Sequence, residues 1–166
     1  SASPPAALFT AEPTSGNKDL RVEFSNSSLR YSTSVWDFGD GEKKTTTTGI
    51  AFHTFSQSGN HNVEVEVIND RGESDKATVN IFVNSPPTIV IEKPGFVRTN
   101  ETATIDASNS YDVEGGNVEF IWDLDLTFDR NGDGDPTNDA DSTSSSVEVM
   151  YSDSGNQTGS VTVVDD

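Results

Sequence analysis

The residues of this chain whose types and spacing could do chemistry are oxygen-bearing side chains concentrated between positions 129 and 141. The segment opens as Asp-Arg-Asn-Gly-Asp-Gly, so oxygen ligands stand at its first, third and fifth positions and Gly134 permits a sharp bend at the sixth. Carboxylate and amide oxygens are the ligands that a hard divalent cation prefers. We therefore predict a Ca²⁺ loop whose candidate ligands are Asp129, Asn131, Asp133, Asp135, Asp139 and Asp141.

The opening of this segment resembles the first half of an EF-hand loop. Ala140 stands at the twelfth position, where that loop has a glutamate, and Pro136 lies inside the segment. Asp139 or Asp141 would then supply the closing carboxylate. Five carboxylates lie within these thirteen residues and repel one another, so a cation would order the segment. The alternative is a solvated acidic insertion that binds nothing.

A second candidate for a cation is the acidic turn that contains Asp112 and Glu114, taken together with Asp123 and Asp125 on the following strand. With both candidates, the chain would hold one or two Ca²⁺ ions. The alternative is a hydrogen-bonded turn in which Asn109 and Asp112 act as caps.

The other polar residues give no catalytic pattern. Asp37, Asp40 and Asp123 stand where strands run into turns, and we expect them to accept backbone N–H groups. His53 and His61 have no serine or carboxylate at a recognisable catalytic spacing, and there is no cysteine to provide a thiolate. We therefore expect no enzymatic activity.

The elements that position these groups repeat along the chain. Residues 36–41 read Trp-Asp-Phe-Gly-Asp-Gly, and residues 122–125 read Trp-Asp-Leu-Asp. Further on, 55–60 and 151–156 share an aromatic residue, a serine and a Ser-Gly-Asn end. Repetition at this level predicts two modules in tandem. The core motif comprises Trp36, Asp37, Phe38, Gly39, Asp40 and Gly41, and Trp122 and Asp123 are its second occurrence. We expect Gly39, Asp40 and Gly41 to have positive φ, as a hairpin turn needs.

The Trp-Asp-Phe-Gly-Asp-Gly motif, with the later aromatic-x-x-x-Gly and a valine-rich strand ending at residues 69–72, resembles a PKD (polycystic kidney disease) domain. The resemblance implies an immunoglobulin-like β-sandwich that lies outside the cytoplasm and acts as a spacer or interaction module. The second module resembles a PKD-like variant that carries the acidic insertion. The predicted division is a linker at 1–5, PKD domain 1 at 6–84, a proline linker at 85–87 and PKD-like domain 2 at 88–166.

Alternating apolar and polar residues predict β-strands throughout and no helix. Two immunoglobulin-like sandwiches in tandem are therefore the expected fold, with a buried tryptophan in each. The expected strands are 8–11, 20–24, 36–38, 43–48, 50–55, 63–67 and 77–83 in the first module, and 88–92, 102–106, 118–124, 146–151 and 160–164 in the second.

The second module is expected to lack a last strand. Aligning Gly155 with Gly59 places Asp166 on Asp70, whereas the first module continues to Val83. Either the chain is truncated there, or a partner strand completes the sheet by β-strand addition.

The charge is strongly acidic and unevenly distributed. The net charge is −18, and residues 86–166 hold 17 acidic and 3 basic residues. Such a surface repels nucleic acid and anionic lipid, and no apolar run is long enough for a membrane span. The opening residues read as an interdomain linker, so we expect a piece of a larger secreted or cell-surface protein of bacterial origin.

The expected function is that of a non-catalytic spacer or interaction pair whose partners are the other domains of the parent protein, with Ca²⁺ rigidifying domain 2. One alternative is an accessory of a secreted hydrolase that binds polysaccharide or a fibrous protein through Tyr31, Tyr111 or Phe96. Another is adhesion or assembly by strand addition at the open edge of domain 2. The sequence leaves the oligomeric state open.

Overall fold

A computed structural model describes residues 3–166, and the chain divides into two compact units, residues 1–85 (unit 1) and 86–166 (unit 2). All regular secondary structure in residues 3–166 is β-strand, so the predicted all-β fold is confirmed. No helix in this range has the length and apolar composition needed to span a bilayer.

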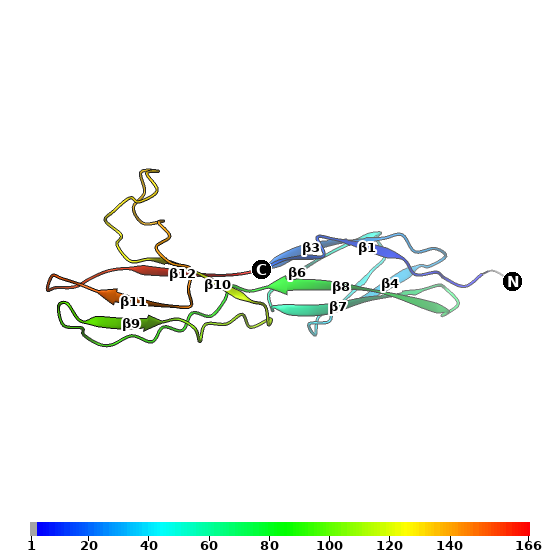
Figure 1. The fold of residues 1–166 in the computed structure, drawn as a ribbon. Helices are drawn as coiled ribbons and strands as arrows, with labels where there is room; N and C mark the ends of the chain where they lie inside the picture. The colour runs from blue at the N-terminus through cyan, green and yellow to red at the C-terminus, as the bar shows by residue number, and fades with distance from the viewer. Residues whose placement is uncertain (1–2) are drawn as a thin grey trace. The chain divides into compact units, whose positions relative to one another are not determined.

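Unit 1 is a sandwich of two sheets, drawn in blue to green in Figure 1. A three-stranded sheet with the order β1-β3-β6 packs against a five-stranded sheet with the order β2-β8-β7-β4-β5. The strands are β1 (Phe9–Glu12), β2 (Ser15–Asn17), β3 (Leu20–Asn26), β4 (Thr33–Asp37), β5 (Lys43–Thr46), β6 (Ile50–Phe55), β7 (Gly59–Ile68) and β8 (Ser74–Asn84).

The alternation of the sequence explains how these strands bury one face. On β7, Val63, Val65 and Val67 have no exposed surface, while the residues between them face outward. Trp36 on β4 is fully buried, packs edge-on against Phe9 at 5.1 Å between ring centroids, and donates its indole N–H to the Thr46 hydroxyl at 3.2 Å. The prediction that Trp36 anchors the core is confirmed.

The turn between β4 and β5 follows the predicted motif with one correction. Gly39 and Gly41 have φ of 76° and 98°, whereas Asp40 does not have a positive φ. The Asp37 and Asp40 side chains accept the backbone N–H groups of Gly39 and Glu42, both at 3.1 Å. Because these side-chain contacts close the turn, two left-handed residues are sufficient.

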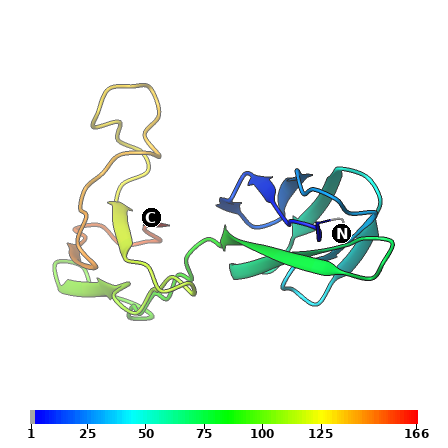
Figure 2. The ribbon, with the colours of Figure 1, turned by 90° about the vertical axis from the view of Figure 1, so that its right-hand side faces the viewer.

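Unit 2 consists of two two-stranded antiparallel sheets, β10-β12 and β11-β9. Its core includes Trp122, Phe120 and Val163, so the buried role predicted for Trp122 is confirmed. The acidic insertion connects β10 to β11 and protrudes from unit 2 as the yellow-to-orange loop in Figure 2. The strands are β9 (Thr102–Asp106), β10 (Val118–Asp123), β11 (Ser146–Met150) and β12 (Ser160–Asp165).

The strand predicted at residues 88–92 is wrong. Only two isolated pairs form, between Thr88 and Tyr111 and between Glu92 and Asp106. Between these two pairs, the Ser110 hydroxyl accepts the Val90 N–H at 3.0 Å and donates to the Val90 carbonyl at 3.3 Å. A side chain thus makes the hydrogen bonds that the backbone of a paired strand would make. The segment is extended but has no continuous ladder.

Two further features of unit 1 differ from the sequence prediction. Strand β2, which was not predicted, pairs in parallel with β8 over three residues. The linker predicted at residues 1–5 is shorter than expected, because Pro5 is buried and the Pro4 carbonyl accepts the Arg30 Nε–H at 2.7 Å. Residues 1–2 of that predicted linker lie outside the described residues.

The two units place their tryptophans in the same pairing register. Trp36 on β4 lies opposite Val65 on β7, and Trp122 on β10 lies opposite Val161 on β12. The offset between β7 and β12 is therefore 96 positions, which equals the offset between Gly59 and Gly155 in the repeated sequence. Residues of the two strands can thus be compared one by one.

Candidate cation-binding insertion of unit 2

The insertion is anchored at its base on Trp122. The Trp122 N–H donates to the Ser142 carbonyl at 2.8 Å, and the Asp141 N–H donates to the Trp122 carbonyl at 2.7 Å. The insertion continues directly from β10 at its N-terminal end, and its C-terminal end is fixed by these two backbone hydrogen bonds to the core tryptophan of unit 2. The acidic residues lie on a loop with a defined base.

Two aspartates hold the loop in shape from inside. Asp129 accepts the N–H groups of Gly132 at 2.6 Å and Gly134 at 2.9 Å. Asp139, which is only 3% exposed, accepts the N–H groups of Arg130 at 2.6 Å and Asn131 at 2.9 Å. The side chains of Asp129 and Asp139, the first and eleventh residues of the segment, therefore both accept N–H groups of the loop backbone. These hydrogen bonds link the two sides of the loop.

The remaining candidate ligands form consecutive turns. The Asn131 side chain accepts the Asp133 N–H at 2.9 Å, and the Asp133 side chain accepts the Asp135 N–H at 2.8 Å. Asp135 accepts both the N–H and the hydroxyl of Thr137, the latter at 2.6 Å. Each of these oxygens is therefore engaged by the loop's own donors.

Hydrogen bonds keep several of these carboxylates ionised. The Asn138 side chain, with the Asp135 backbone, lowers the pKa of Asp133. The Thr137 hydroxyl and backbone N–H lower the pKa of Asp135, and Thr127 does the same for Asp125. At neutral pH these groups are anionic, so they repel one another and attract cations.

One buried carboxylate oxygen at the base of the insertion has no partner. Asp123 is 3% exposed, and its Oδ1 accepts the Asp125 N–H at 3.2 Å, whereas its Oδ2 has no hydrogen-bond partner among residues 3–166. The Trp122–Ser142 pair places Asp123 opposite Asp141, which binds Arg130 at 2.9 Å and the Leu124 N–H at 2.8 Å. An unpaired buried carboxylate oxygen is costly, so a cation fits this position.

The turn with Asp112 and Glu114 is separate from the insertion. Asp112 accepts the N–H groups of Glu114 at 3.0 Å and Gly116 at 2.7 Å, as the alternative reading of a hydrogen-bonded turn expects. This turn precedes the start of β10, whereas Asp125 follows its end. Five residue steps of strand span roughly 17 Å. Asp112 and Asp125 therefore lie at opposite ends of β10, and a cation held by the acidic turn stays a prediction.

Within residues 3–166, no group of three acidic or histidine side chains converges as a ready-made metal cluster. The candidate ligands point at the backbone of their own loop instead. The Ca²⁺ loop therefore stays a prediction. From the sequence we assigned Asp123 to the core motif and also named it beside the second cation candidate.

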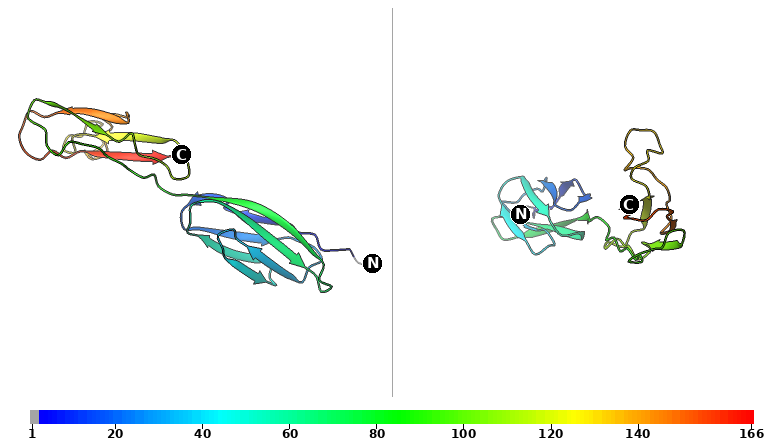
Figure 3. Two further views of the ribbon diagram at one scale, coloured as in Figure 1. Left: turned by 90° about the horizontal axis from the view of Figure 1, so that it is seen from below. Right: turned by 90° about the vertical axis from the view of Figure 1, so that its left-hand side faces the viewer.

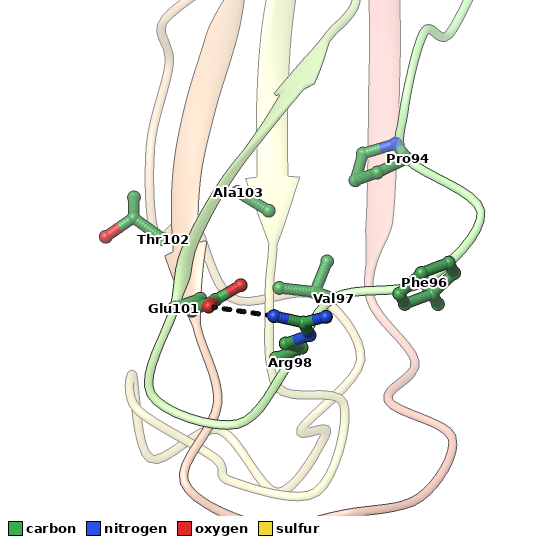
Figure 4. Close-up of a pocket in the computed structure, with 7 residues that line it drawn as sticks. All are labelled: Pro94, Phe96, Val97, Arg98, Glu101, Thr102 and Ala103. Carbon is green, nitrogen blue, oxygen red and sulfur yellow. Dashed lines mark ion pairs between the residues drawn. The ribbon is translucent and has the colours of Figure 1, made fainter.

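The aromatic residues named for ligand binding differ in their exposure. Phe96 is 80% exposed and Tyr111 51% exposed, while Tyr31 packs against the core of unit 1. Phe96 is one of the residues that line a hollow of about 380 Å³. Figure 4 shows these residues, with the ion pair between Arg98 and Glu101 as a dashed line. A polysaccharide or fibrous-protein ligand stays a prediction.

The comparison with sequence families agrees with the motif in unit 1. The model of the PKD domain matches residues 1–83, half of the chain. The chain belongs to the PKD domain family. The PKD match covers the buried Trp36 strand, the glycine turn and both sheets of unit 1.

A curated relative is a multidomain precursor. The PKD-containing chain is 28% identical over 90 residues to a pre-pro-metalloprotease, PrtV, of Vibrio cholerae serotype O1, in two strains. The aligned part covers 54% of this chain and 10% of that protein. The chain thus spans about a tenth of the length of the curated relatives it matches.

The chain also matches solved structures, each with a TM-score below 0.5. A structure reported for carbohydrate-binding modules of the β-sandwich superfamily is 18% identical, with a TM-score of 0.49, and the match covers 98% of this chain and 84% of that one. Fibronectin(III)-like modules of Clostridium thermocellum CbhA are 19% identical, with a TM-score of 0.41 and coverages of 96% and 86%. A solution structure from Methanosarcina mazei is 34% identical, with a TM-score of 0.39 and coverages of 50% and 55%.

Proposed function

We propose that this chain is a non-catalytic accessory segment of a larger extracellular protein, in which it spaces or presents other domains and in which Ca²⁺ stiffens unit 2. The observation that carries the proposal is the PKD match over residues 1–83, in a chain that corresponds to a tenth of a metalloprotease precursor. The motif aspartates support it, since Asp37 and Asp40 accept backbone N–H groups that hold the turn.

The proposal for Ca²⁺ rests on the chemistry of the insertion. Its oxygens are hard ligands, hydrogen bonds lower the pKa of Asp133 and Asp135, and the Asp123 Oδ2 lies buried and unpartnered at its base. Asp129, Asn131, Asp133, Asp135 and Asp139 would hold an ion in the loop, while Asp123 with Asp141 is the candidate at the base. A bound divalent cation would offset the repulsion and fix the loop.

The test is a calorimetric titration with Ca²⁺, together with thermal unfolding in millimolar Ca²⁺ and in chelator. Because an ion that binds only the folded state stabilises it by about 2.7 kcal/mol at a hundredfold excess over Kd, the midpoint of unit 2 should rise. The Asp129→Asn/Asp133→Asn double variant, which keeps oxygen acceptors for the loop backbone, should lose that rise if the ion lies in the loop. Asp123→Asn should lose it if the ion lies at the base.

The matched control is Glu148→Gln, because Glu148 is an exposed acid on β11, outside the insertion. It should keep the full response. Titration heats and melting curves that are the same with Ca²⁺ and with chelator would remove the ion and leave the accessory role to be judged on the family match alone.

A further inference from the structure

In both units, the aspartate after the motif tryptophan makes the same first contact. In unit 1, Asp37 Oδ1 accepts the Gly39 N–H at 3.1 Å. In unit 2, on strand β10, which lies beside the red strand β12 in Figure 3, Asp123 Oδ1 accepts the Asp125 N–H at 3.2 Å. Each carboxylate fixes the backbone two residues further on, so the two aspartates are structural counterparts and their second oxygens can be compared.

The second oxygen of the aspartate in unit 1 binds a side-chain cation. Asp37 Oδ2 lies 2.8 Å from the ammonium nitrogen of Lys43. The hydrogen bond from this ammonium lowers the pKa of Asp37. Lys43 comes directly before Lys44, the residue of β5 that lies opposite Trp36. The neighbouring strand therefore supplies a positive charge from the position before the tryptophan's pairing partner.

Unit 2 has an acid at the position of this lysine. The residue opposite Trp122 is Ser142, and the residue before it is Asp141. That position therefore provides no ammonium for Asp123, whose Oδ2 is buried and has no hydrogen-bond partner within residues 3–166. The repeat thus places a second carboxylate where unit 1 has the cation of an ion pair.

Arg130 compensates only one of these two carboxylates. Its Nη2 lies 2.9 Å from Asp141 Oδ1, and the Leu124 N–H donates to Asp141 Oδ2 at 2.8 Å. Both oxygens of Asp141 are therefore engaged, whereas Asp123 Oδ2 is not. The Arg130 side chain is 63% exposed and that of Asp141 only 13%, so the arginine can turn into solvent while the carboxylates stay in place. Two buried carboxylates with one guanidinium are a costly arrangement that a further positive charge would relieve.

We propose that Asp123 and Asp141 form a regulated cation site, in which a divalent cation takes the part that the Lys43 ammonium has in unit 1 and Arg130 competes with that cation for Asp141. This inference rests on the proposed binding of Ca²⁺ to unit 2, and it assigns the site and its regulation. Without the ion, Arg130 binds Asp141; when the ion binds, the arginine is released. With two acidic ligands, and carbonyl or water oxygens for the rest, the expected Kd is about 0.1–1 mM.

Calorimetric titration of the whole chain with Ca²⁺ tests the competition. Since an exposed ion pair is worth a factor of about two to five, Arg130→Gln should bind Ca²⁺ about threefold more tightly than the unsubstituted chain. In chelator the same variant should unfold at a lower temperature, because the ion pair with Asp141 is lost. Arg98→Gln is the matched control: it removes the same charge from unit 2, where Arg98 pairs with Glu101, and should leave the Kd unchanged.

A second comparison needs no Ca²⁺. Asp141→Lys and Asp141→Met lose the same contacts and differ only in the ammonium group. In chelator, unit 2 of the lysine variant should unfold about 5 °C above that of the methionine variant, because the ammonium pairs with Asp123 as Lys43 does with Asp37. The difference should vanish when Asp123→Asn is added to both variants.

Equal midpoints for the lysine and methionine variants would overturn the proposal, and so would an Arg130→Gln variant that binds Ca²⁺ no more tightly than the unsubstituted chain. Full binding by Asp141→Met, with binding lost in Asp129→Asn/Asp133→Asn, would place the ion in the loop. The proposed function would then stand and the regulated site would fall. No heat from the unsubstituted chain in millimolar Ca²⁺ would remove both.

Discussion

At the scale of single residues, Asp40 shows how a motif carboxylate supports the fold. Its Oδ2 lies 2.6 Å from the His53 Nε2, and the two side chains are 11% and 9% exposed. The His53 ring stacks on Phe38 at 4.0 Å between centroids, while its Nδ1 lies 3.8 Å from Glu42. The pair therefore ties the turn after β4 to strand β6.

The pH dependence of unit 1 follows from the ionisation of Asp40. Burial raises the pKa of Asp40, but the hydrogen bonds from His53 and from the Glu42 backbone outweigh it, so the pKa lies below its ordinary value of 3.8. A lowered folded-state pKa gives a stabilisation that is complete above the ordinary value and is lost as the pH falls through the folded-state value.

We expect Asp40→Asn to lower the free energy of unfolding of unit 1 by about 1.5–3 kcal/mol at pH 7, because a charged hydrogen bond is lost. The difference from the unsubstituted chain should shrink as the pH falls below 4, where Asp40 itself becomes protonated. Urea unfolding between pH 3 and 7 measures it. Asp70→Asn, in an exposed turn, is the control and should show little effect at any pH. A difference that grows towards low pH would contradict the assignment.

At the scale of elements, the hairpin β4–β5 depends on a close approach between its turn and strand β7. Gly39 has φ of 76°, and a Cβ atom there would lie 2.8 Å from the Asn62 carbonyl oxygen and 3.0 Å from its nitrogen. Gly41 has φ of 98° but no heavy atom within 4 Å of such a Cβ. The first glycine is required by its backbone angle and by space, and the second by its angle alone.

Gly39→Ala should therefore destabilise unit 1 by about 3 kcal/mol, because both backbone strain and a clash with fixed backbone are introduced. Gly41→Ala, the matched control, should cost about 1 kcal/mol from strain alone. Denaturant unfolding followed by Trp36 fluorescence measures both. Equal losses for the two variants would show that the contact with Asn62 does not limit this turn.

At the scale of the whole molecule, the chain has two separate cores, each built around one tryptophan. The unit 1 core contains thirteen buried residues, many with no exposed surface, and the unit 2 core contains six, most of them slightly exposed. Since burial of apolar surface is the main source of stability, unit 2 should be the less stable unit.

We expect two unfolding transitions on heating, with unit 2 unfolding first. Each tryptophan reports on its own unit, so fluorescence of the Trp122→Phe variant should show the upper transition alone, and that of Trp36→Phe the lower one. Calorimetry of the unsubstituted chain supplies the reference midpoints. Coincident transitions from the two single-tryptophan variants would contradict independent cores.

Much of this architecture could be predicted from residue spacing, because alternation and tight turns are local properties. The valines of β7, both buried tryptophans and the glycines at positions 39 and 41 are of this kind. The strand predicted at residues 88–92 failed because the Ser110 hydroxyl, eighteen or more residues away in the chain, occupies the place of a ladder partner. The pairing of Asp40 with His53 has the same long-range origin.

By itself the sequence determined that the chain is all-β, repeated around a tryptophan motif, and acidic in its second half. Only the tertiary structure decided that Asp123 is buried with an oxygen unpaired, and that Asp112 and Asp125 lie at opposite ends of β10. The physical reason is that strand periodicity is encoded by neighbours along the chain, whereas burial, pairing partners and uncovered edges depend on which distant segments meet.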